Sequence, residues 1–250
     1  MTGLRQVTPV AGVVLAPNPG PMTLDGTNTW VLRAPGHASC AVIDPGPLHE
    51  GHLAEVARCG PVEAILLTHG HPDHSDGARR LAELTGAPVR ALDPAHRVGA
   101  EGLRDGEVVA AGGLELRVVA TPGHTADSLS FTVEGAILTG DTILGRGTTV
   151  VAHPDGVLAH YLDSLRRVGS FGDLTILPGH GPELASAGAA AAYYLAHREE
   201  RLLQVRAAVD GGATTPAEVV AVVYADVDRA LWPAAELSVR AALLYLETRP

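Results

Sequence analysis

The stretch Thr68-His69-Gly70-His71-Pro72-Asp73-His74 decides how this chain is interpreted. It follows an apolar run at residues 64–67 and precedes a segment with helical spacing, so it is expected to form a loop at the end of a strand. In an extended loop His69 and His71 point the same way, which leaves Asp73 and His74 on the other side of the turn. Four candidate ligands so close together, within six residues, can hardly all serve one tetrahedral ion. The stretch therefore predicts a metal site and favours a second ion.

Three further segments repeat the pattern of a strand end followed by a potential metal ligand. One such histidine or aspartate alone is more often a turn residue, but together and in this order the segments favour metal binding. Imidazole and carboxylate ligands suit zinc, and they also allow iron or manganese. The segments are Thr121-Pro122-Gly123-His124-Thr125, Thr139-Gly140-Asp141-Thr142 and Leu177-Pro178-Gly179-His180-Gly181.

Short apolar runs alternate with helical patterns along most of the chain, which indicates the α/β class. Strands are predicted at residues 29–33, 39–43, 62–67, 88–92, 107–110, 114–120, 128–133, 136–139 and 173–177. Helices are predicted at residues 49–58, 74–84 and 155–168. From residue 184 onward the pattern is helical, with a break near residues 211–212.

The last part of the chain differs in character from the rest. Thr215-Pro216 has the pattern of an N-cap and a first-turn proline, and a second helix is expected at residues 234–246. We therefore expect a catalytic domain at residues 1–182 and a small, winged-helix-like appendage at residues 183–250. The apolar positions of the appendage suit packing on the catalytic domain, a pocket wall or a homodimer contact; they are Val219, Val222, Val223, Leu231, Leu237, Leu243 and Leu244.

The overall composition restricts the partners of the protein. The formal net charge of −10 disfavours non-specific attraction to nucleic acid, although a local basic groove stays compatible with it. Every one of the 18 basic residues is an arginine. Cys40 and Cys59 lack metal-ligand spacing and are expected to be free thiols of a reducing compartment. We find neither a signal-peptide pattern nor an apolar run of membrane-spanning length, so a cytoplasmic location without membrane partners is expected.

The order of these motifs also carries a resemblance. The pattern H-x-H-x-D-H, followed by G-H, G-D and G-H at strand ends, resembles the metallo-β-lactamase superfamily. The resemblance implies an αβ/βα four-layer sandwich with a dinuclear, zinc-type site. It implies that the first metal is held by His69, His71 and His124, the second by Asp73, His74 and His180, and that Asp141 bridges both. Asp73 is then the candidate for accepting a proton from a metal-bound water, and Asp76, Thr125 and Asp127 are candidates for orienting the histidines.

A second resemblance covers nearly the whole chain. Residues 18–30, residues 143–150 and a tail containing Tyr224 and Trp232 are similar to the lactamase-β-like-2 group, which includes a single-strand endoribonuclease and thioesterases. Glyoxalase II shares the metal set but binds glutathione through a basic tail, whereas residues 183–250 hold nine acidic residues against six arginines. Polar, glycine-flanked loops often shape substrate access. On that basis Asn28, Arg146, Thr148 and Thr149 are the candidate substrate contacts.

Three functions follow as hypotheses. The first is a metallohydrolase that uses a metal-bound hydroxide on a small ester or thioester. The second is cleavage of single-stranded RNA, which the negative charge and the scarcity of aromatic residues weaken. The third is a non-catalytic binding module that keeps its metals for structure, which a complete dinuclear ligand set makes the weakest of the three.

Overall fold

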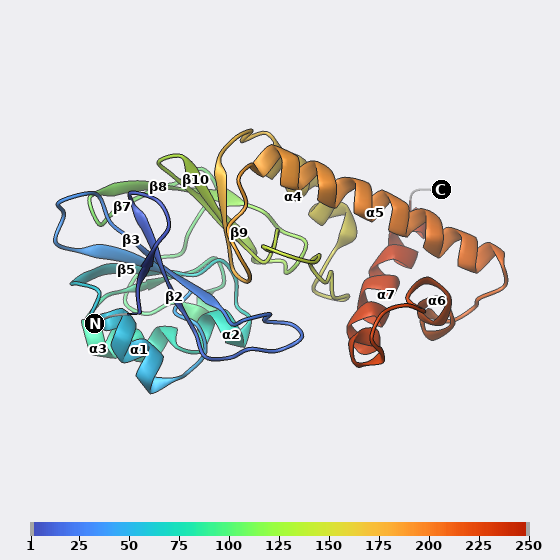
Figure 1. The fold of residues 1–250 in the computed structure, drawn as a ribbon, viewed down its shortest axis with the longest axis horizontal. Coiled ribbons are helices and arrows are strands. Elements are labelled where there is room, and N and C mark those ends of the chain that lie inside the picture. The colour runs from blue at the N-terminus through green and yellow to red at the C-terminus, as the bar shows by residue number, and fades with distance from the viewer. Residues whose placement is uncertain (1–2, 249–250) are drawn as a thin grey trace.

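Two β-sheets are stacked face to face with helices on their outer faces, and the C-terminal helices extend from one side of this sandwich (Figure 1). The structure is a computed structural model that describes residues 3–248. Helices α1 (Glu50–Ala57) and α3 (Ala78–Thr85) lie on the outside of the first sheet, and α4 (Leu158–Gly169) lies on the outside of the second. This layering is the predicted αβ/βα sandwich.

The first sheet has six strands in chain order. The first four strands pair antiparallel, and β4, β5 and β6 pair parallel, so helices connect the parallel strands. Sequence reasoning missed the first two strands, because the apolar run around Val13 and Val14 is short and lies between prolines. The strands are β1 (Arg5–Gln6), β2 (Ala11–Leu15), β3 (Asn28–Leu32), β4 (Cys40–Ile43), β5 (Val62–Leu66) and β6 (Val89–Arg90).

The second sheet has five strands in the order β11-β10-β9-β8-β7. Only β10 and β11 pair parallel, and α4 connects them across the outer face. All five coincide closely with predicted strands. They are β7 (Val108–Ala111), β8 (Leu114–Ala120), β9 (Leu129–Val133), β10 (Ala136–Gly140) and β11 (Thr175–Pro178).

The central strands are buried on both faces because they carry apolar side chains at successive positions. In β4, Ala41 and Ile43 belong to the core between the sheets, while Cys40 and Val42 pack under α1 and α3. This division follows the two-residue period of a strand. Burial of this kind stabilises the fold by roughly 25 cal/mol for each Å² of apolar surface removed from water. A rigid double sheet therefore carries the loops at its edge.

The helix predicted over residues 74–84 is wrong in one respect: the structure divides it into α2 (Pro72–Ser75) and α3. The chain turns at Gly77, where a Cβ atom would lie 2.8 Å from Leu53 Cδ2 and 2.9 Å from the backbone oxygen of Gly46. Glycine is needed here for close packing against α1 and its preceding loop. The break gives α2, which carries Asp73 and His74, an orientation independent of α3. A single turn of 3₁₀ helix, η1 (Pro94–His96), follows further along.

Three helices end the chain: α5 (Ala187–Asp210), α6 (Pro216–Val223) and α7 (Trp232–Thr248), the last preceded by the 3₁₀ turn η2 (Arg229–Leu231). Helix α5 runs along α4 and reaches α6 and α7 at its far end (Figure 1). All of them share one apolar core with α4. Of the predicted apolar positions Val219 is fully buried there, whereas Val222 is exposed. Among residues 3–248, no helix combines the length and apolar character needed to cross a membrane.

Candidate metal centre

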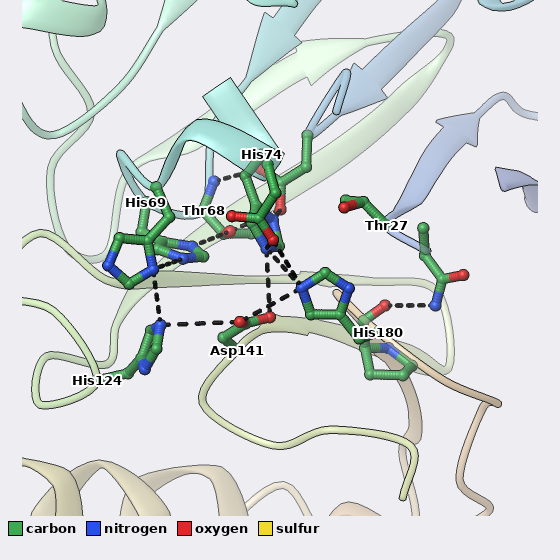
Figure 2. A network of polar contacts seen from close by, with 12 residues as sticks. Thr27, Thr68, His69, His74, His124, Asp141 and His180 are labelled. Carbon is green, nitrogen blue, oxygen red and sulfur yellow. Dashed lines mark hydrogen bonds and ion pairs between the residues drawn. The ribbon is translucent and has the colours of Figure 1, made fainter. Parts of the chain in front are cut away.

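Loops that follow four strands bring the predicted ligands to one edge of the two stacked sheets. The loop after β5 and helix α2 carry His69, His71, Asp73 and His74. From the second sheet, the loops after β8, β10 and β11 contribute His124, Asp141 and His180. Figure 2 shows His69, His74, His124, Asp141 and His180 pointing toward one another. Residues from opposite halves of the sequence therefore meet at this edge.

The first group consists of His69, His71 and His124. The Nδ1 atom of His71 lies 3.1 Å from Nε2 of His69 and 3.1 Å from Nε2 of His124. Zinc–nitrogen bonds of about 2.0–2.1 Å in tetrahedral geometry place neighbouring ligand atoms about 3.3 Å apart. The three ring nitrogens therefore have the spacing of ligands that share one ion.

The second group consists of Asp73, His74 and His180. The Nε2 atoms of the two histidines lie 3.1 Å apart, and Oδ2 of Asp73 lies 3.0 Å from Nε2 of His180. Asp141 lies between the groups, with Oδ1 3.4 Å from His74 and Oδ2 3.7 Å from His124 (Figure 2). This aspartate thus faces both groups, as a bridging ligand would.

For four of the five histidines, hydrogen bonds on the far side of the ring fix which nitrogen carries the proton of the neutral form. The Nδ1 of His124 faces the carbonyl oxygen of Val150 at 2.8 Å, and the Nδ1 of His180 faces that of Gly26 at 3.1 Å. A carbonyl oxygen only accepts, so both rings carry a proton on Nδ1, and in their neutral form they present a lone pair at Nε2.

The same logic applies to His69 and His74 through Asp44. The hydroxyl of Thr68 donates to Asp44, so it accepts from Nδ1 of His69 at 3.0 Å, and Nδ1 of His74 donates to Asp44 Oδ2 at 2.8 Å. In the neutral form of these four rings, four imidazole lone pairs would therefore converge, and Asp141 Oδ1 is buried without a hydrogen-bond partner. Converging lone pairs and an unpartnered carboxylate oxygen are what cations satisfy, so the residues fit a metal centre.

Asp44 was missed by sequence reasoning, which had suggested Asp76, Thr125 and Asp127 for orienting the histidines. Its carboxylate accepts from the backbone N–H of Thr68 at 2.8 Å, from the hydroxyl of Thr68 at 2.6 Å and from His74. The residue is buried and has a positive φ of 51°. A signal was present, because Asp44 follows β4 directly and so ends a buried strand as the other site residues do.

Two glycines are required for these loops to approach one another. A Cβ atom at Gly179 would lie 2.5 Å from Oδ1 of Asp141 and 2.7 Å from Cε1 of His74. Gly123 has a φ of +133°, and a Cβ there would lie 2.3 Å from the backbone nitrogen of Tyr161. The glycine in the Pro-Gly pair before each of His124 and His180 therefore lets the backbone come close to neighbouring residues, and it also lets the chain turn.

Burial and mutual charge shift the pKa values within the centre in different directions. Burial lowers the pKa of His69 well below its ordinary value, and burial likewise lowers that of His124. Burial opposes protonation of His74 too, but the carboxylates of Asp141 and Asp44 outweigh it and raise its pKa. For Asp141, burial favours the neutral acid, yet His74 and His180 hold its pKa well below the usual range. The carboxylate needed for metal binding is therefore present at neutral pH, and metal binding is expected to displace a proton from His74.

A pocket of about 340 Å³ opens beside the centre, with His124 and Asp141 in its wall. The opposite wall comes from the C-terminal helices and includes Leu231 and Ala235. Most of its remaining lining is apolar. A volume in this range suits a small organic ligand. The C-terminal segment therefore lines the pocket beside the candidate metal centre, which is one of the roles that the sequence had left open for it.

Three of the four predicted substrate contacts line this pocket: Arg146, Thr148 and Thr149. Arg146 lies exposed at the mouth and is paired with Asp25, with nitrogen–oxygen distances of 2.6 and 2.9 Å. The hydroxyl of Thr149 donates to the backbone oxygen of Asp141 at 2.6 Å, which holds the bridging loop in place.

The fourth predicted contact, Asn28, lies elsewhere. Its side-chain amide donates to the backbone oxygens of Pro178 and Gly181 at 3.0 and 2.8 Å. Both amide hydrogens are thereby used inside the protein, and the residue is buried outside the pocket lining. Asn28 thus fixes the backbone on both sides of His180, which is a positioning role in place of the predicted contact.

Comparison with known proteins agrees with this geometry. Residues 22–180 match the Metallo-beta-lactamase superfamily, and residues 215–249 match the Beta-lactamase associated winged helix domain. The chain is 33% identical to Beta-lactamase-like protein 2 homolog of Drosophila melanogaster, over 94% of this chain and 86% of that protein. It is 34% identical to an atrochrysone carboxyl ACP thioesterase of Aspergillus fumigatus, over 84% of this chain and 72% of that protein. A crystal structure of a metallo-beta-lactamase family protein from Thermus thermophilus superposes with a TM-score of 0.81 at 25% identity, covering 96% of this chain and 94% of that one.

Fold and site together define an enzyme of the metal-dependent hydrolase class. The chain belongs to the metallo-β-lactamase superfamily, and its curated relatives match the lactamase-β-like-2 group that the sequence resembles.

Proposed function

We propose that the chain is a dinuclear, zinc-dependent hydrolase of a small thioester or ester. The observation that carries the proposal is the largely apolar pocket of about 340 Å³ that has His124 and Asp141 in its wall. Such a pocket suits an acyl group whose carbonyl carbon reaches the metal centre. The relative named as an acyl-carrier-protein thioesterase supports the same substrate class.

The residues that would hold the ions follow from the two groups. His69, His71 and His124 would hold one ion, and Asp73, His74 and His180 the other, with Asp141 shared. When bound, two such ions supply Lewis-acid activation of a carbonyl and lower the pKa of a shared water. Hydrogen bonds on the far side of the rings already orient the histidines, so serving as ligands would require loss of a proton from His74 but little movement of the rings.

Asp73 is the residue to which we assign proton transfer. Its side chain is 28% exposed, against 11% for Asp141, so it is the more accessible of the two carboxylates. Burial favours the neutral acid, but the hydrogen bond from His180 and the charge of His74 outweigh it and lower the pKa of Asp73. The carboxylate is therefore ionised at neutral pH and can accept a proton from attacking water. Arg146, Thr148 and Thr149, which line the pocket, are proposed to contact the substrate.

The test combines metal analysis with a substrate panel. Purified protein is analysed for bound metals per chain, and the same sample is assayed against acyl thioesters, aryl esters and a single-stranded RNA. The proposal predicts two zinc ions per chain and thioester or ester turnover that a chelator removes and zinc restores. Turnover of RNA alone would move the protein to the nuclease function, and metal binding with no turnover of any substrate would indicate the non-catalytic module.

A matched pair of variants ties turnover to the centre. His69→Ala is expected to abolish turnover, because its Nε2 belongs to the first group. His160→Ala is the control, since His160 lies exposed on α4. Equal activity of His69→Ala and the parent protein would contradict the assignment.

A further inference from the structure

The pocket beside the metal centre carries positive charge that the described chain does not neutralise. Helix α5 presents His197, Arg198 and Arg201 to it, and residues spaced by three or four along a helix lie on one face. Among residues 3–248, Asp141 is the sole carboxylate that lines the pocket, and it belongs to the metal centre. A positive pocket in a chain of net charge −10 calls for a local explanation.

Of the two arginines that α5 presents to the pocket, Arg198 has the more unusual surroundings. It is only 6% exposed, and its Nη2 donates to the backbone oxygen of Thr149 while its guanidinium lies 5.1 Å from the centre of the Tyr161 ring. Its Nε is buried without a hydrogen-bond partner. In the part of the chain that the structure describes, it forms no ion pair with a carboxylate. A buried guanidinium without a counter-ion is costly, so something outside the chain is expected to compensate it.

Arg201 is held in position beside it. Its Nη1 donates to Oε1 of Gln204 at 2.7 Å and to the backbone oxygen of Val223 at 3.0 Å, and the guanidinium lies 4.7 Å from the centre of the Tyr224 ring. These contacts fix the group without neutralising it, since none of its partners within residues 3–248 is a carboxylate. Burial first, and then the charges of Arg198 and Arg201, lower the pKa of His197 against a smaller opposing effect of Glu200.

We propose that Arg198 and Arg201 form a subsite for a carboxylate carried by the acyl group of the substrate, remote from the carbonyl that reacts. The proposal rests on the proposed hydrolase function and specifies its substrate class. A planar guanidinium matches a carboxylate in geometry and charge. The pocket volume of about 340 Å³ and the apolar side chains of Leu144 and Leu231 suit a short acyl chain that ends in one small charged group.

The experiment compares two thioesters of N-acetylcysteamine that share one acyl chain length. Glutaryl thioester carries a terminal carboxylate, and pentanoyl thioester carries a methyl group instead. The zinc-loaded parent protein is expected to hydrolyse the glutaryl thioester with a kcat/KM roughly tenfold higher than that of the pentanoyl thioester. Roughly tenfold is the factor that one charge-assisted hydrogen bond contributes. Arg201→Met should remove the preference, and Arg201→Lys should retain part of it. Arg206→Met, at an exposed position of the same helix, is the matched control and should leave the preference unchanged.

A binding measurement separates this inference from the hydrolase function. Calorimetric titration of the zinc-loaded protein with glutarate and with pentanoate should show the same preference and the same loss in Arg201→Met. If neither thioester is hydrolysed but the preference for binding glutarate depends on Arg201, the proposed hydrolase function is refuted and the carboxylate subsite is supported. If both thioesters are hydrolysed equally well, and Arg201→Met slows both alike, the subsite is refuted and the function stands.

Discussion

Exchanging Asp44 for Asn tests whether the histidine tautomers prepare the metal centre. The asparagine oxygen can still accept from the backbone N–H of Thr68, which lies 2.8 Å from the present Oδ1. Its NH₂ group would then face Nδ1 of His74, which now donates to Oδ2 at 2.8 Å. To avoid two facing hydrogens, His74 must move its proton to Nε2, which removes the lone pair offered to the second ion.

The expected loss can be worked from these contacts. Loss of such an orienting partner weakens metal binding by about 10–100-fold. The variant also loses a buried charge-assisted hydrogen bond, which costs roughly 1.5–3 kcal/mol of stability. Zinc affinity is measured by competition with a chromophoric chelator, and stability by urea unfolding of the metal-free protein.

The control is Glu63→Gln. Glu63 also accepts from a hydroxyl, that of Ser39, and from a backbone N–H, that of Gly112, but it lies away from the centre. Its exchange should leave zinc affinity unchanged. If Asp44→Asn binds both ions with the affinity of the parent protein, the tautomer argument is refuted.

Three other outcomes are expected. Gly179→Ala should lose the second metal and most activity, because its Cβ would lie 2.5 Å from Asp141 Oδ1. Elemental analysis checks this, with Gly211→Ala at the C-cap of α5 as the control. Burial raises the pKa of the Cys40 thiol to about 11, so the thiol stays neutral below that pH. At about pH 8 the native protein should therefore resist labelling by iodoacetamide until it is unfolded. Rapid labelling of native Cys40, read by mass spectrometry, would contradict the burial. Thr215→Ala removes the cap that accepts from the backbone N–H of Glu218 at 3.3 Å and should cost about 1 kcal/mol in thermal unfolding without changing zinc stoichiometry.

The sequence was sufficient to predict that the seven side chains of the candidate metal centre gather at one place, since residues of metal-binding type recur at strand ends and loops at the same sheet edge must meet; their role as metal ligands stays a prediction. It was also sufficient for most strands, because fully apolar runs bounded by Gly and Pro have few alternatives. It was insufficient for Asp44 and Asn28, whose roles depend on contacts with residues 24 or more positions away. The sequence was equally insufficient to predict that Arg198 is unpaired in the described part of the chain, since helical spacing does not say which arginine lacks a counter-ion. The domain division at residue 182 stays a prediction.

The most direct test of the account is the metal itself, located by diffraction. Crystals of zinc-loaded protein should give two peaks in an anomalous difference map collected at the zinc absorption edge. One peak is expected among His69, His71 and His124, the other among Asp73, His74 and His180, with Asp141 in contact with both. A single peak, or peaks away from these seven side chains, would contradict the dinuclear centre on which the proposed hydrolysis depends.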